Sequence, residues 1–393
     1  AVPRPLLVAG AGGANHSQFA IMGCMASQVV SGQELRFPKH AFLATAQADF
    51  HRDFKLGQKL GTGSQGSVYA ARRLDGSDFA VKVIDPRFKD SRGRPIMGNA
   101  ALAIEVAREV AVLRALPKCM NIIEFHDFYA CEGLAYIVLE LCPVGLLEFL
   151  QGLPSLTEVV LRPVFKDMLS AISACHDAMI VHRDVKCDNF LVAIEGSERV
   201  PIVKLCDFGV GCKFHSADVD EMMGAIGAPL HMAPEMVSGQ KYGAKVDIWA
   251  FGVLCYVLLY GRWLYEPGAP SAASIMEAIR VGAPAPDFRG DAVLSKDCTD
   301  WVRALLRRDP ASRLTARRAL AHRSFQGSWA STELHGSLQS AVRCGVIGKA
   351  VVGCTELDAR LARLSACSSR CSAKPNLSDV STNSGSDRPA GDL

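Results

Sequence analysis

The sequence predicts an α+β protein, and three observations lead to this fold class. Residues 54–60 and 67–72 are strand-like and flank a glycine-rich turn, and the apolar run 79–84 adds a third strand. Residues 100–116 then show the apolar spacing of a helix. Residues 248–260 are almost entirely apolar, but they are too few to span a bilayer, so we expect a buried core helix.

The turn between the first two strands contains Gly61, Gly63 and Gly66 in the pattern G-x-G-x-x-G. Glycine lets a backbone close over phosphate groups, so the pattern indicates a nucleotide site. The pattern alone is weak, because dinucleotide-binding folds also use it, but there it opens a helix. Here a strand follows. We therefore expect a phosphate-binding hairpin.

The third strand carries one lysine, Lys82, among apolar residues. Such a lysine needs a carboxylate to hold it in place, and the following helix offers two. Glu105 and Glu109 are four residues apart and therefore share a helix face. The alternative is that both are solvated carboxylates near Arg108.

Three motifs between residues 182 and 235 resemble those of one enzyme family. Residues 182–189 read His-Arg-Asp-Val-Lys-Cys-Asp-Asn, and Asp-Phe-Gly (207–209) and Ala-Pro-Glu (233–235) follow in that order. This is the series of catalytic loop, metal-binding loop and anchor in protein kinases. On these motifs the chain resembles the eukaryotic protein kinase family, over about residues 54–325.

The resemblance implies a bilobal protein-kinase-like fold. A small β-rich N-lobe would cover residues 54–139, a hinge residues 140–142, and a mainly helical C-lobe residues 143–325. Residues 1–53 and 326–393 would flank this domain.

The resemblance also implies phosphoryl transfer, which depends on positioned charge. Asp184 would be the catalytic base for the attacking hydroxyl, and Lys186 would neutralise charge on the γ-phosphoryl group of ATP. A lysine at that position points to Ser or Thr as the acceptor. Asn189 and Asp207 would bind Mg²⁺ through oxygen atoms. Taken singly, each has an ordinary alternative as a turn, cap or solvated residue.

The N-terminal residues would hold the nucleotide. Lys82 would bind the α- and β-phosphates, and the resemblance selects Glu109 over Glu105 as its partner. After a strand at 136–139, Leu139 would be the gatekeeper. The remaining contacts follow from the family pattern. The glycines of the turn would cover the phosphates, and Val68 and Ala80 would pack against the adenine rings. Backbone groups of Glu140 and Cys142 would face the edge of the adenine.

Two further positions extend the resemblance through the larger lobe. Asp247, at the start of the apolar helix, would brace the catalytic loop, and Arg313 would pair with Glu235. With a cysteine beside the hinge and the closing motif Asp-Pro-x-x-Arg-Leu-Thr (309–315), the layout is most similar to calcium/calmodulin-dependent-type kinases.

Composition agrees with one such domain plus flanks, since 393 residues with 49% apolar and 21% charged residues can bury two lobes. A net charge of +3 spread along the chain does not favour a nucleic-acid partner, and the basic cluster at 87–94 is expected to be a solvated loop. The 14 cysteines include no C-x-x-C pair, which favours reduced thiols and a cytoplasmic location.

The N-terminal flank contains Met22-Gly23-Cys24-Met25-Ala26-Ser27, which fits the N-myristoylation pattern M-G-x-x-x-[ST]. Myristate on Gly23 and palmitate on Cys24 would attach the protein to a membrane surface, because two acyl chains anchor stably. This requires Met22 to be the true start. A chance match to the pattern is the open alternative.

The C-terminal flank is expected to be largely disordered, because its end is rich in Ser, Asn, Asp and Gly. Before that end, Leu357, Leu361 and Leu364 lie on one face of an expected helix. Packing on its own lobe or exposure to solvent is favoured over an inhibitory role.

The sequence departs from the family pattern at two positions. Ala228 stands where Ser/Thr kinases usually carry Thr, whose hydroxyl bonds the catalytic Asp and Lys. Its loss would orient Asp184 less firmly, and a slower enzyme and an unusual acceptor preference are the two open consequences. Leu146 stands where many members carry an acidic residue that touches ribose or substrate.

The expected activation segment has Ser216 as its one hydroxyl acceptor. An acidic group there, Asp218, Asp220 or Glu221, could replace a phosphate as the partner of Arg183. A solvated acidic run is the alternative.

The sequence thus predicts an ATP- and Mg²⁺-dependent Ser/Thr protein kinase that acts on protein substrates. The competing interpretation is a pseudokinase scaffold without catalysis, which Ala228 favours and the retained catalytic residues oppose. A third interpretation is a membrane-tethered adaptor in which acylation dominates function.

Overall fold

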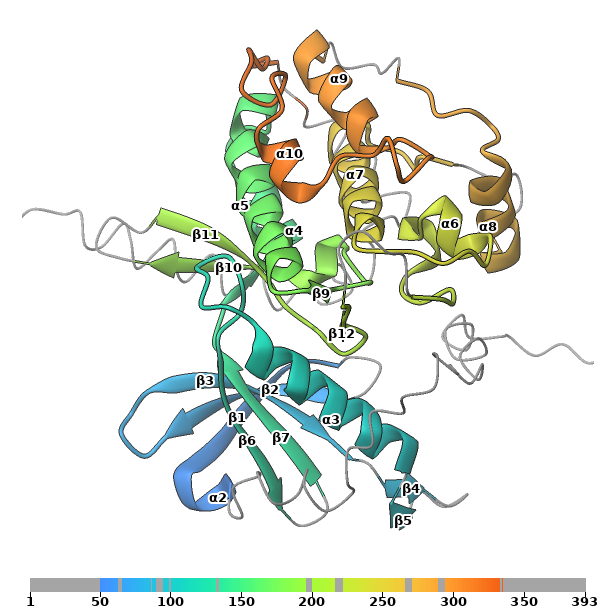
Figure 1. Ribbon diagram of the computed structural model, residues 1–393. Helices are drawn as coiled ribbons and strands as arrows, with labels where there is room; N and C mark the ends of the chain where they lie inside the picture. The colour runs from blue at the N-terminus through green and yellow to red at the C-terminus, as the bar shows by residue number, and fades with distance from the viewer. Residues whose placement is uncertain are drawn as a thin grey trace, which may run out of the picture. The chain divides into compact units, whose positions relative to one another are not determined.

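The computed structural model describes residues 50–62, 66–85, 87–89, 95–98, 100–131, 134–195, 200–215, 222–265, 271–288, 294–332 and 334. The chain divides into two compact units, 1–347 and 348–393, and the second lies outside the described residues. The first contains a β-sheet lobe and a mainly helical lobe, drawn below and above in Figure 1. The predicted bilobal α+β fold is confirmed.

The N-terminal lobe is built on a five-stranded antiparallel sheet in the order β1-β2-β3-β7-β6. Its strands are β1 (Phe54–Thr62), β2 (Ser67–Arg73), β3 (Asp78–Ile84), β6 (Phe125–Cys131) and β7 (Leu134–Glu140). The central position of β3 explains its nearly continuous apolar run, because a strand with neighbours on both sides is buried along its length.

Two helices accompany this sheet. The longer, α3 (Ala100–Ala115), crosses it (Figure 1) and is the helix expected at 100–116. The shorter, α2 (Phe50–Asp53), begins before the predicted domain start, because the fully buried Phe50 ring stacks 4.3 Å from Tyr136 and 5.2 Å from Phe54. A single aromatic residue has no periodicity, so the sequence pattern did not reveal it.

The basic segment that we predicted as a solvated loop contains a short two-stranded hairpin. Its strands are β4 (Arg87–Lys89) and β5 (Pro95–Gly98), paired antiparallel. Strands this short leave too few residues for an alternating pattern to be recognised.

The larger lobe is mainly helical. Its helices are α4 (Leu146–Gln151), α5 (Glu158–Asp177), α6 (Pro234–Val237), α7 (Lys245–Tyr260), α8 (Ala272–Val281), α9 (Lys296–Leu305) and α10 (Ala316–Leu320). Residues 246–260 of α7 are all buried, which confirms the predicted core helix. Among the described residues, no helix is long and apolar enough to cross a membrane.

Short strands of this lobe carry the loops that face the sheet lobe. One sheet has the order β11-β10-β8, and another pairs β12 with β9. Their bounds are β8 (Val144–Gly145), β9 (Ile180–Val181), β10 (Phe190–Glu195), β11 (Val200–Leu205) and β12 (Cys212–Lys213), with 3₁₀ turns η1 (Cys187–Asn189) and η2 (Pro229–His231).

The helical lobe extends past its predicted end at 325. Trp329 is 8% exposed and packs on Trp301 and Phe325, and the N–H of Leu334 donates to the carbonyl of Leu156 at 2.6 Å. Buried Glu158 accepts a hydrogen bond from the N–H of Ala330 at 2.7 Å. The described residues 326–332 and 334 are therefore part of the packed lobe and not of a disordered tail.

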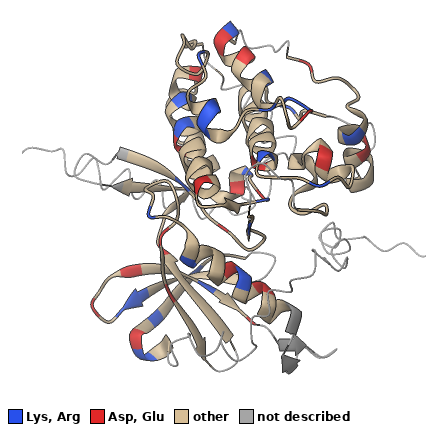
Figure 2. Ribbon diagram, in the orientation of Figure 1, with Lys and Arg blue, Asp and Glu red and all other residues tan. Residues whose placement is uncertain are grey.

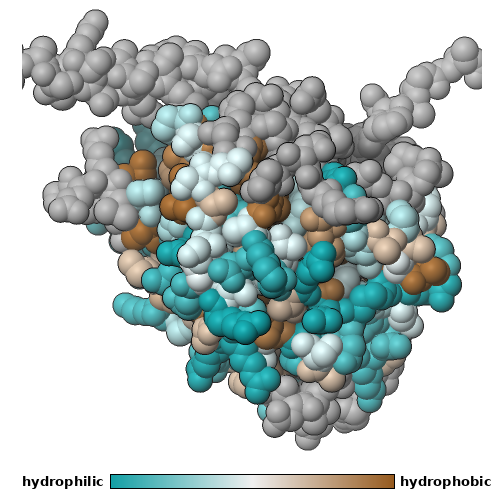
Figure 3. Space-filling view, turned by 90° about the horizontal axis from the view of Figure 1, so that it is seen from above, coloured by the Kyte–Doolittle hydropathy of each residue, from teal (hydrophilic) through white to brown (hydrophobic). Residues whose placement is uncertain are grey.

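Charges of both signs are mixed along the described elements of both lobes (Figure 2). The face seen from above is mostly hydrophilic with apolar residues between the polar ones (Figure 3). Large exposed apolar side chains in the described residues, such as Leu74 and Met120, belong to separate segments.

Candidate active site

Backbone pairing and an ion pair join the sheet lobe to the helical lobe. The N–H of Ile123 donates to the carbonyl of Leu205 (3.0 Å), and the N–H of Leu205 donates to the carbonyl of Asn121 (2.8 Å). Lys204 of β11 places its Nζ 2.9 Å from Oε1 of Glu140, at the end of β7. These contacts fix the edge of the sheet lobe to the helical lobe.

Lys82 lies where the lobes face each other. Its Nζ is 2.7 Å and 2.9 Å from the two carboxylate oxygens of Glu109 and 3.1 Å from Oδ1 of Asp207. The side chains of Lys82 and Glu109 are 10% and 3% exposed, whereas that of Asp207 is 48% exposed. The structure thus pairs Lys82 with Glu109, as predicted, and brings Lys82 to Asp207 of the predicted metal-binding loop.

The opposite charges of Lys82 and Asp207 stabilise the charged form of each other. Burial would lower the pKa of Lys82, but the carboxylates of Glu109 and Asp207 hold it above its usual value. Burial would raise the pKa of Asp207, but the Lys82 ammonium holds it below its usual value. Lys82 therefore stays cationic and Asp207 anionic at neutral pH.

The predicted phosphate-binding turn is partly described. Gly61 is in β1 and Gly66 directly precedes β2, whereas Gly63 lies outside the described residues. A Cβ on Gly66 would lie 2.3 Å from the carbonyl oxygen of Val83, closer than any real contact. Glycine is required there because the turn presses against the β3 backbone.

The predicted adenine contacts lie on adjacent strands. Val68 on β2 is half-buried, and Ala80 on β3 is 8% exposed and sits opposite Leu139 of β7. The N–H of Glu140 donates to the carbonyl of Glu124 (2.9 Å) and is already engaged. Cys142 follows in the hinge and is buried.

The predicted catalytic loop brings three side chains together. Oδ2 of Asp184 accepts hydrogen bonds from Nζ of Lys186 at 2.6 Å and from Nδ2 of Asn189 at 3.1 Å. The same amide donates to the Asp184 carbonyl at 2.7 Å. Burial would lower the pKa of Lys186, but the Asp184 carboxylate keeps it raised.

Asp247 braces this loop from α7, as predicted. Its buried carboxylate accepts hydrogen bonds from the N–H groups of His182 (2.9 Å) and Arg183 (2.8 Å). His176 of α5 adds a contact at 2.9 Å. Arg183 holds the left-handed φ of +66°, which persists only where the surroundings enforce it.

A cation could be held between Asn189 and Asp207. Asp207 is charged and half-exposed, with a left-handed φ of +58° that turns the loop sharply. The two hydrogen bonds donated by Nδ2 of Asn189 leave its amide oxygen as the atom that could coordinate. Hard oxygen ligands of this kind suit Mg²⁺, so the residues fit the predicted ion.

The departure at Ala228 is partly compensated by the backbone. The N–H of Ala228 donates to Oδ1 of Asp184 at 3.0 Å. Gly227 has φ +97°, and a Cβ there would lie 2.3 Å from the Arg183 carbonyl oxygen. The glycine therefore allows the chain to approach Asp184 closely, and a backbone group holds the carboxylate where a hydroxyl was expected.

The second departure has a structural explanation. Leu146 opens α4 with only 1% of its surface exposed, so it packs in the helical lobe. The predicted pair of Arg313 and Glu235 is present in the same lobe, bidentate at 2.6 Å and 3.0 Å.

Two contacts around the site were not anticipated from the sequence: the pair of Lys204 with Glu140 and the support of Asp247 by His176. Each joins residues distant in the chain and belongs to no spacing pattern.

Several predicted residues lie outside the described part of the chain. They are Gly23 and Cys24 of the acylation pattern, the activation-segment residues Ser216, Asp218, Asp220 and Glu221, and Leu357, Leu361 and Leu364. Their roles stay predictions.

Comparison with known proteins identifies similar chains. The family model described as protein kinase domain matches residues 54–325. A calcium/calmodulin-dependent serine/threonine-protein kinase 1 from Oryza sativa subsp. japonica is 34% identical over 286 residues, which are 71% of this chain and 45% of that protein. CDPK-related kinase 7 from Arabidopsis thaliana is 34% identical over 286 residues, 71% of this chain and 47% of its own length.

CBL-interacting protein kinase 20 from Oryza sativa subsp. japonica is 31% identical over 278 residues, 70% of this chain and 57% of its own. The expected similarity to calcium/calmodulin-dependent-type kinases is confirmed, because these relatives include a calcium/calmodulin-dependent kinase. The chain spans about half the length of the curated relatives it matches.

Proposed function

This chain belongs to the protein kinase family, and from this premise we propose that it transfers the γ-phosphoryl group of ATP to Ser or Thr hydroxyls of protein substrates. One observation carries the proposal: the side chains of Lys82, Glu109 and Asp207 meet in one cluster, although they come from three distant parts of the chain. A lysine held by a carboxylate beside an acidic loop residue is the arrangement that phosphoryl transfer from ATP requires.

In the proposed reaction the protein acts mainly by positioning charge. Lys82, cationic and held by Glu109, binds the α- and β-phosphates. Asp184 accepts the proton of the acceptor hydroxyl, in an orientation set by the N–H of Ala228. Lys186 shields the negative charge on the phosphoryl group as it moves.

Asn189 and Asp207 would hold Mg²⁺, which when bound neutralises charge on the β- and γ-phosphates. Gly61, Gly63 and Gly66 would cover the phosphates with backbone. Val68 and Ala80 would pack on adenine, whose edge would face the Glu140 carbonyl and the Cys142 backbone. Because the Glu140 N–H is engaged with Glu124, only its carbonyl is assigned to adenine.

Membrane attachment is a separate part of the proposal and rests on the sequence pattern at Gly23 and Cys24 alone. The kinase would then work at the cytoplasmic surface of a membrane. Mass spectrometry of the native protein tests this: myristate on Gly23 is expected, and an N-terminus upstream of Met22 refutes it.

The second candidate is a pseudokinase scaffold, which Ala228 favours because it removes a side-chain bond to Asp184. Transfer of labelled phosphate from ATP with Mg²⁺ to a generic basic protein decides between the two. We expect transfer by the wild type and Asp177→Asn, an exposed control on α5, and a loss of roughly 10²–10⁴-fold in Asp184→Asn. Nucleotide binding without transfer in the wild type would establish the scaffold.

A further inference from the structure

Tyr242 lies in the loop between α6 and α7, and none of the proposed catalytic steps uses it. The residue is buried, with 1% of its surface exposed. Its backbone forms an antiparallel bridge with Met222, because the Met222 N–H donates to the Tyr242 carbonyl at 3.1 Å and the Tyr242 N–H donates to the Met222 carbonyl at 2.9 Å. The Tyr242 hydroxyl donates to the carbonyl of Met223 at 3.4 Å. Tyr242 thus holds two consecutive residues near the end of the expected activation segment.

The side chain of Arg183 connects Tyr242 to the beginning of the same segment. Burial raises the pKa of Tyr242, whereas the charge of Arg183 and a hydrogen bond with it act against this shift, so the guanidinium lies beside the hydroxyl. Nε of Arg183 donates to the carbonyl of Val210 at 2.7 Å. Arg183 is itself fixed, because its N–H donates to Asp247 at 2.8 Å. One chain of contacts therefore runs from Met223 through Tyr242 and Arg183 to Val210.

The two ends of the segment also meet directly. Sγ of Cys212 donates to Sδ of Met222 at 3.2 Å. Cys212 is in β12, which pairs with β9, and the catalytic loop follows β9 in the chain. Residues 216–221, between these ends, lie outside the described part of the chain. Closing a loop loses conformational entropy, which the contacts at its two ends must offset.

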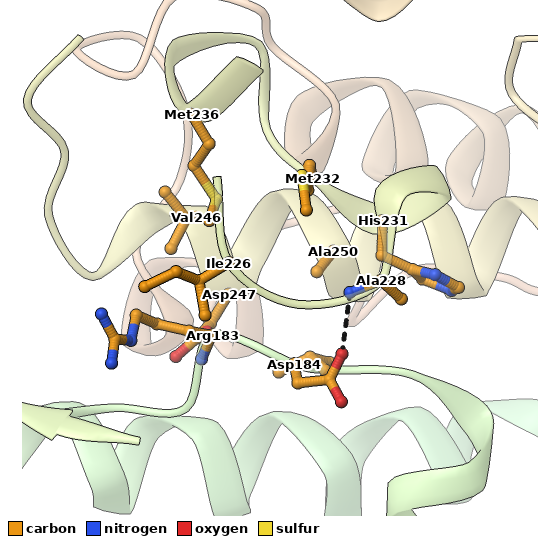
Figure 4. A pocket seen from close by; sticks show the side chains of 11 residues that line it. Arg183, Asp184, Ile226, Ala228, His231, Met232, Met236, Val246, Asp247 and Ala250 are labelled. Carbon is orange, nitrogen blue, oxygen red and sulfur yellow. Dashed lines mark hydrogen bonds between the residues drawn. The ribbon is translucent and has the colours of Figure 1, made fainter. Parts of the chain in front are cut away.

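The end of the segment leads to Ala228, which contacts Asp184. The Ala228 N–H donates to Oδ1 of Asp184 at 3.0 Å, the bond drawn as a dashed line in Figure 4. Arg183 and Asp184 are neighbours in the catalytic loop, but their side chains point in opposite directions (Figure 4). A backbone donor keeps its direction only where the chain that carries it is fixed. The orientation of Asp184 therefore depends on contacts that hold the chain shortly before Ala228.

We propose that Tyr242 is a positioning residue for phosphate transfer. Together with Arg183 it holds both ends of residues 210–223 beside the catalytic loop, and it thereby fixes the chain that presents the Ala228 N–H to Asp184. Tyr242 touches neither the nucleotide nor the acceptor hydroxyl and acts through the position of Asp184. This effect on catalysis rests on the proposed function, whereas the effect on the segment does not.

The direct test is amide hydrogen exchange on the full chain, for the wild type and for Tyr242→Phe. Exchange in residues 222–228 should become about fivefold faster in the variant, because the segment loses a hydrogen bond of ordinary strength. The matched control is Tyr256→Phe, which removes a buried hydroxyl that donates to the Asp287 carbonyl at 2.6 Å. The control should leave exchange in residues 222–228 unchanged. Equal exchange in the wild type and Tyr242→Phe would overturn the proposal.

The kinetic test separates positioning from a general loss of stability. Tyr242→Phe should lower kcat about fivefold without a change in the KM for ATP, because the substitution affects Asp184 and leaves the pair of Lys82 and Glu109 intact. Tyr256→Phe should lower the urea midpoint at least as much as Tyr242→Phe, since its bond is shorter, and should keep the wild-type kcat. An equal loss of kcat in both variants, or an unchanged kcat in Tyr242→Phe, would refute the positioning role.

The role of Arg183 is tested by repeating Tyr242→Phe in the Arg183→Met background, again by hydrogen exchange. There the added effect on residues 222–228 should fall below about twofold, because the hydroxyl keeps only the long bond to Met223 among its described contacts. The full fivefold effect in this background would show that the two residues act independently and would refute the link. Arg183→Lys replaces Arg183→Met if the latter does not fold. If the wild type transfers no phosphate, the proposed function fails, while exchange still decides whether Tyr242 holds the segment.

Discussion

Two buried ion pairs, one in each lobe, use the same chemistry in different surroundings. Arg313 and Glu235 in the helical lobe have side chains that are 0% and 3% exposed. Lys82 and Glu109 in the sheet lobe are almost as buried, but their third partner, Asp207, is 48% exposed. One pair is enclosed by protein, and the other opens onto a loop that faces solvent.

The type of cation differs between the enclosed pair and the open pair. Arg313 uses its five N–H donors on Glu235 and on the carbonyls of Arg307, Arg308 and Lys245, and its guanidinium lies 5.1 Å from the Trp249 ring centroid. A rigid fork suits a permanent contact, whereas a flexible ammonium such as that of Lys82 can exchange partners. The enclosed pair should therefore serve folding and the open pair should serve chemistry.

The largest expected effect comes from breaking the enclosed pair. Arg313→Met leaves the Glu235 carboxylate and three carbonyl oxygens without their donor, so unfolding should become easier by about 3–5 kcal/mol. Thermal and urea unfolding measure this. The matched control is Arg317→Met, because Arg317 makes an exposed ion pair with Asp177. The control should not change the melting temperature, and equal losses in both variants would contradict the comparison.

The open pair should show the reverse behaviour. Lys82→Met should reduce phosphate transfer by about 10²–10³-fold, because a preorganised donor to the transferring group is lost. Stability should fall by less than about 2 kcal/mol, since burial already raises the pKa of Glu109, and without Lys82 that carboxyl can take up a proton. Lys55→Met, an exposed lysine of β1, should change neither property. A Lys82 variant as unstable as Arg313→Met would remove the distinction.

A substitution at the C-terminal end of the helical lobe should have a smaller effect on stability. Trp329→Ala should lower the free energy of unfolding by about 1.5–3 kcal/mol, because the ring is almost fully buried against Trp301 and Phe325. Deletion of residues 348–393 is the control and should leave urea unfolding unchanged, because they form a separate unit. Unchanged stability in Trp329→Ala would show that residues 326–332 do not belong to the lobe.

The same deletion tests the tail for inhibition without disturbing Trp329. If specific activity does not rise when residues 348–393 are removed, inhibition by that part of the tail is untenable. A deletion from Gly327 onward cannot decide this, because it also removes the packed segment.

The smallest effect concerns pH. Burial would raise the pKa of Asp247, but the hydrogen bond from His176 holds it below its usual value near 4. A carboxyl with a depressed folded pKa contributes stability above its unfolded pKa, and this stability is lost as the pH falls through the folded pKa. His176→Phe should therefore cost about 1.5 kcal/mol at pH 7 and should make acid unfolding begin at a higher pH. Identical urea midpoints of both proteins between pH 7 and pH 3 would contradict this role.

Most contacts between residues of the recognised motifs were predicted from the sequence. The pairing of Lys82 with Glu109, the bracing by Asp247 and the ion pair of Arg313 were expected from the family resemblance and are present. Strand and helix positions also followed, because periodicity marks elements that bury one face.

The rest depends on contacts between distant single residues, which leave no pattern. Phe50 joins the sheet core, Lys204 reaches Glu140, and Trp329 closes the helical lobe. At Ala228 the sequence predicted only a loss. The backbone N–H that takes over the contact with Asp184 became visible only in three dimensions, because every residue except proline carries that group.

The measurement that tests the central claim most directly is phosphate transfer per folded molecule for Lys82→Met and Arg313→Met, side by side, at a temperature where both are folded. The account predicts that Arg313→Met transfers phosphate at close to the wild-type rate, while Lys82→Met transfers almost none. A folded Arg313→Met protein that is as inactive as Lys82→Met, or a Lys82→Met protein that remains active, would contradict it.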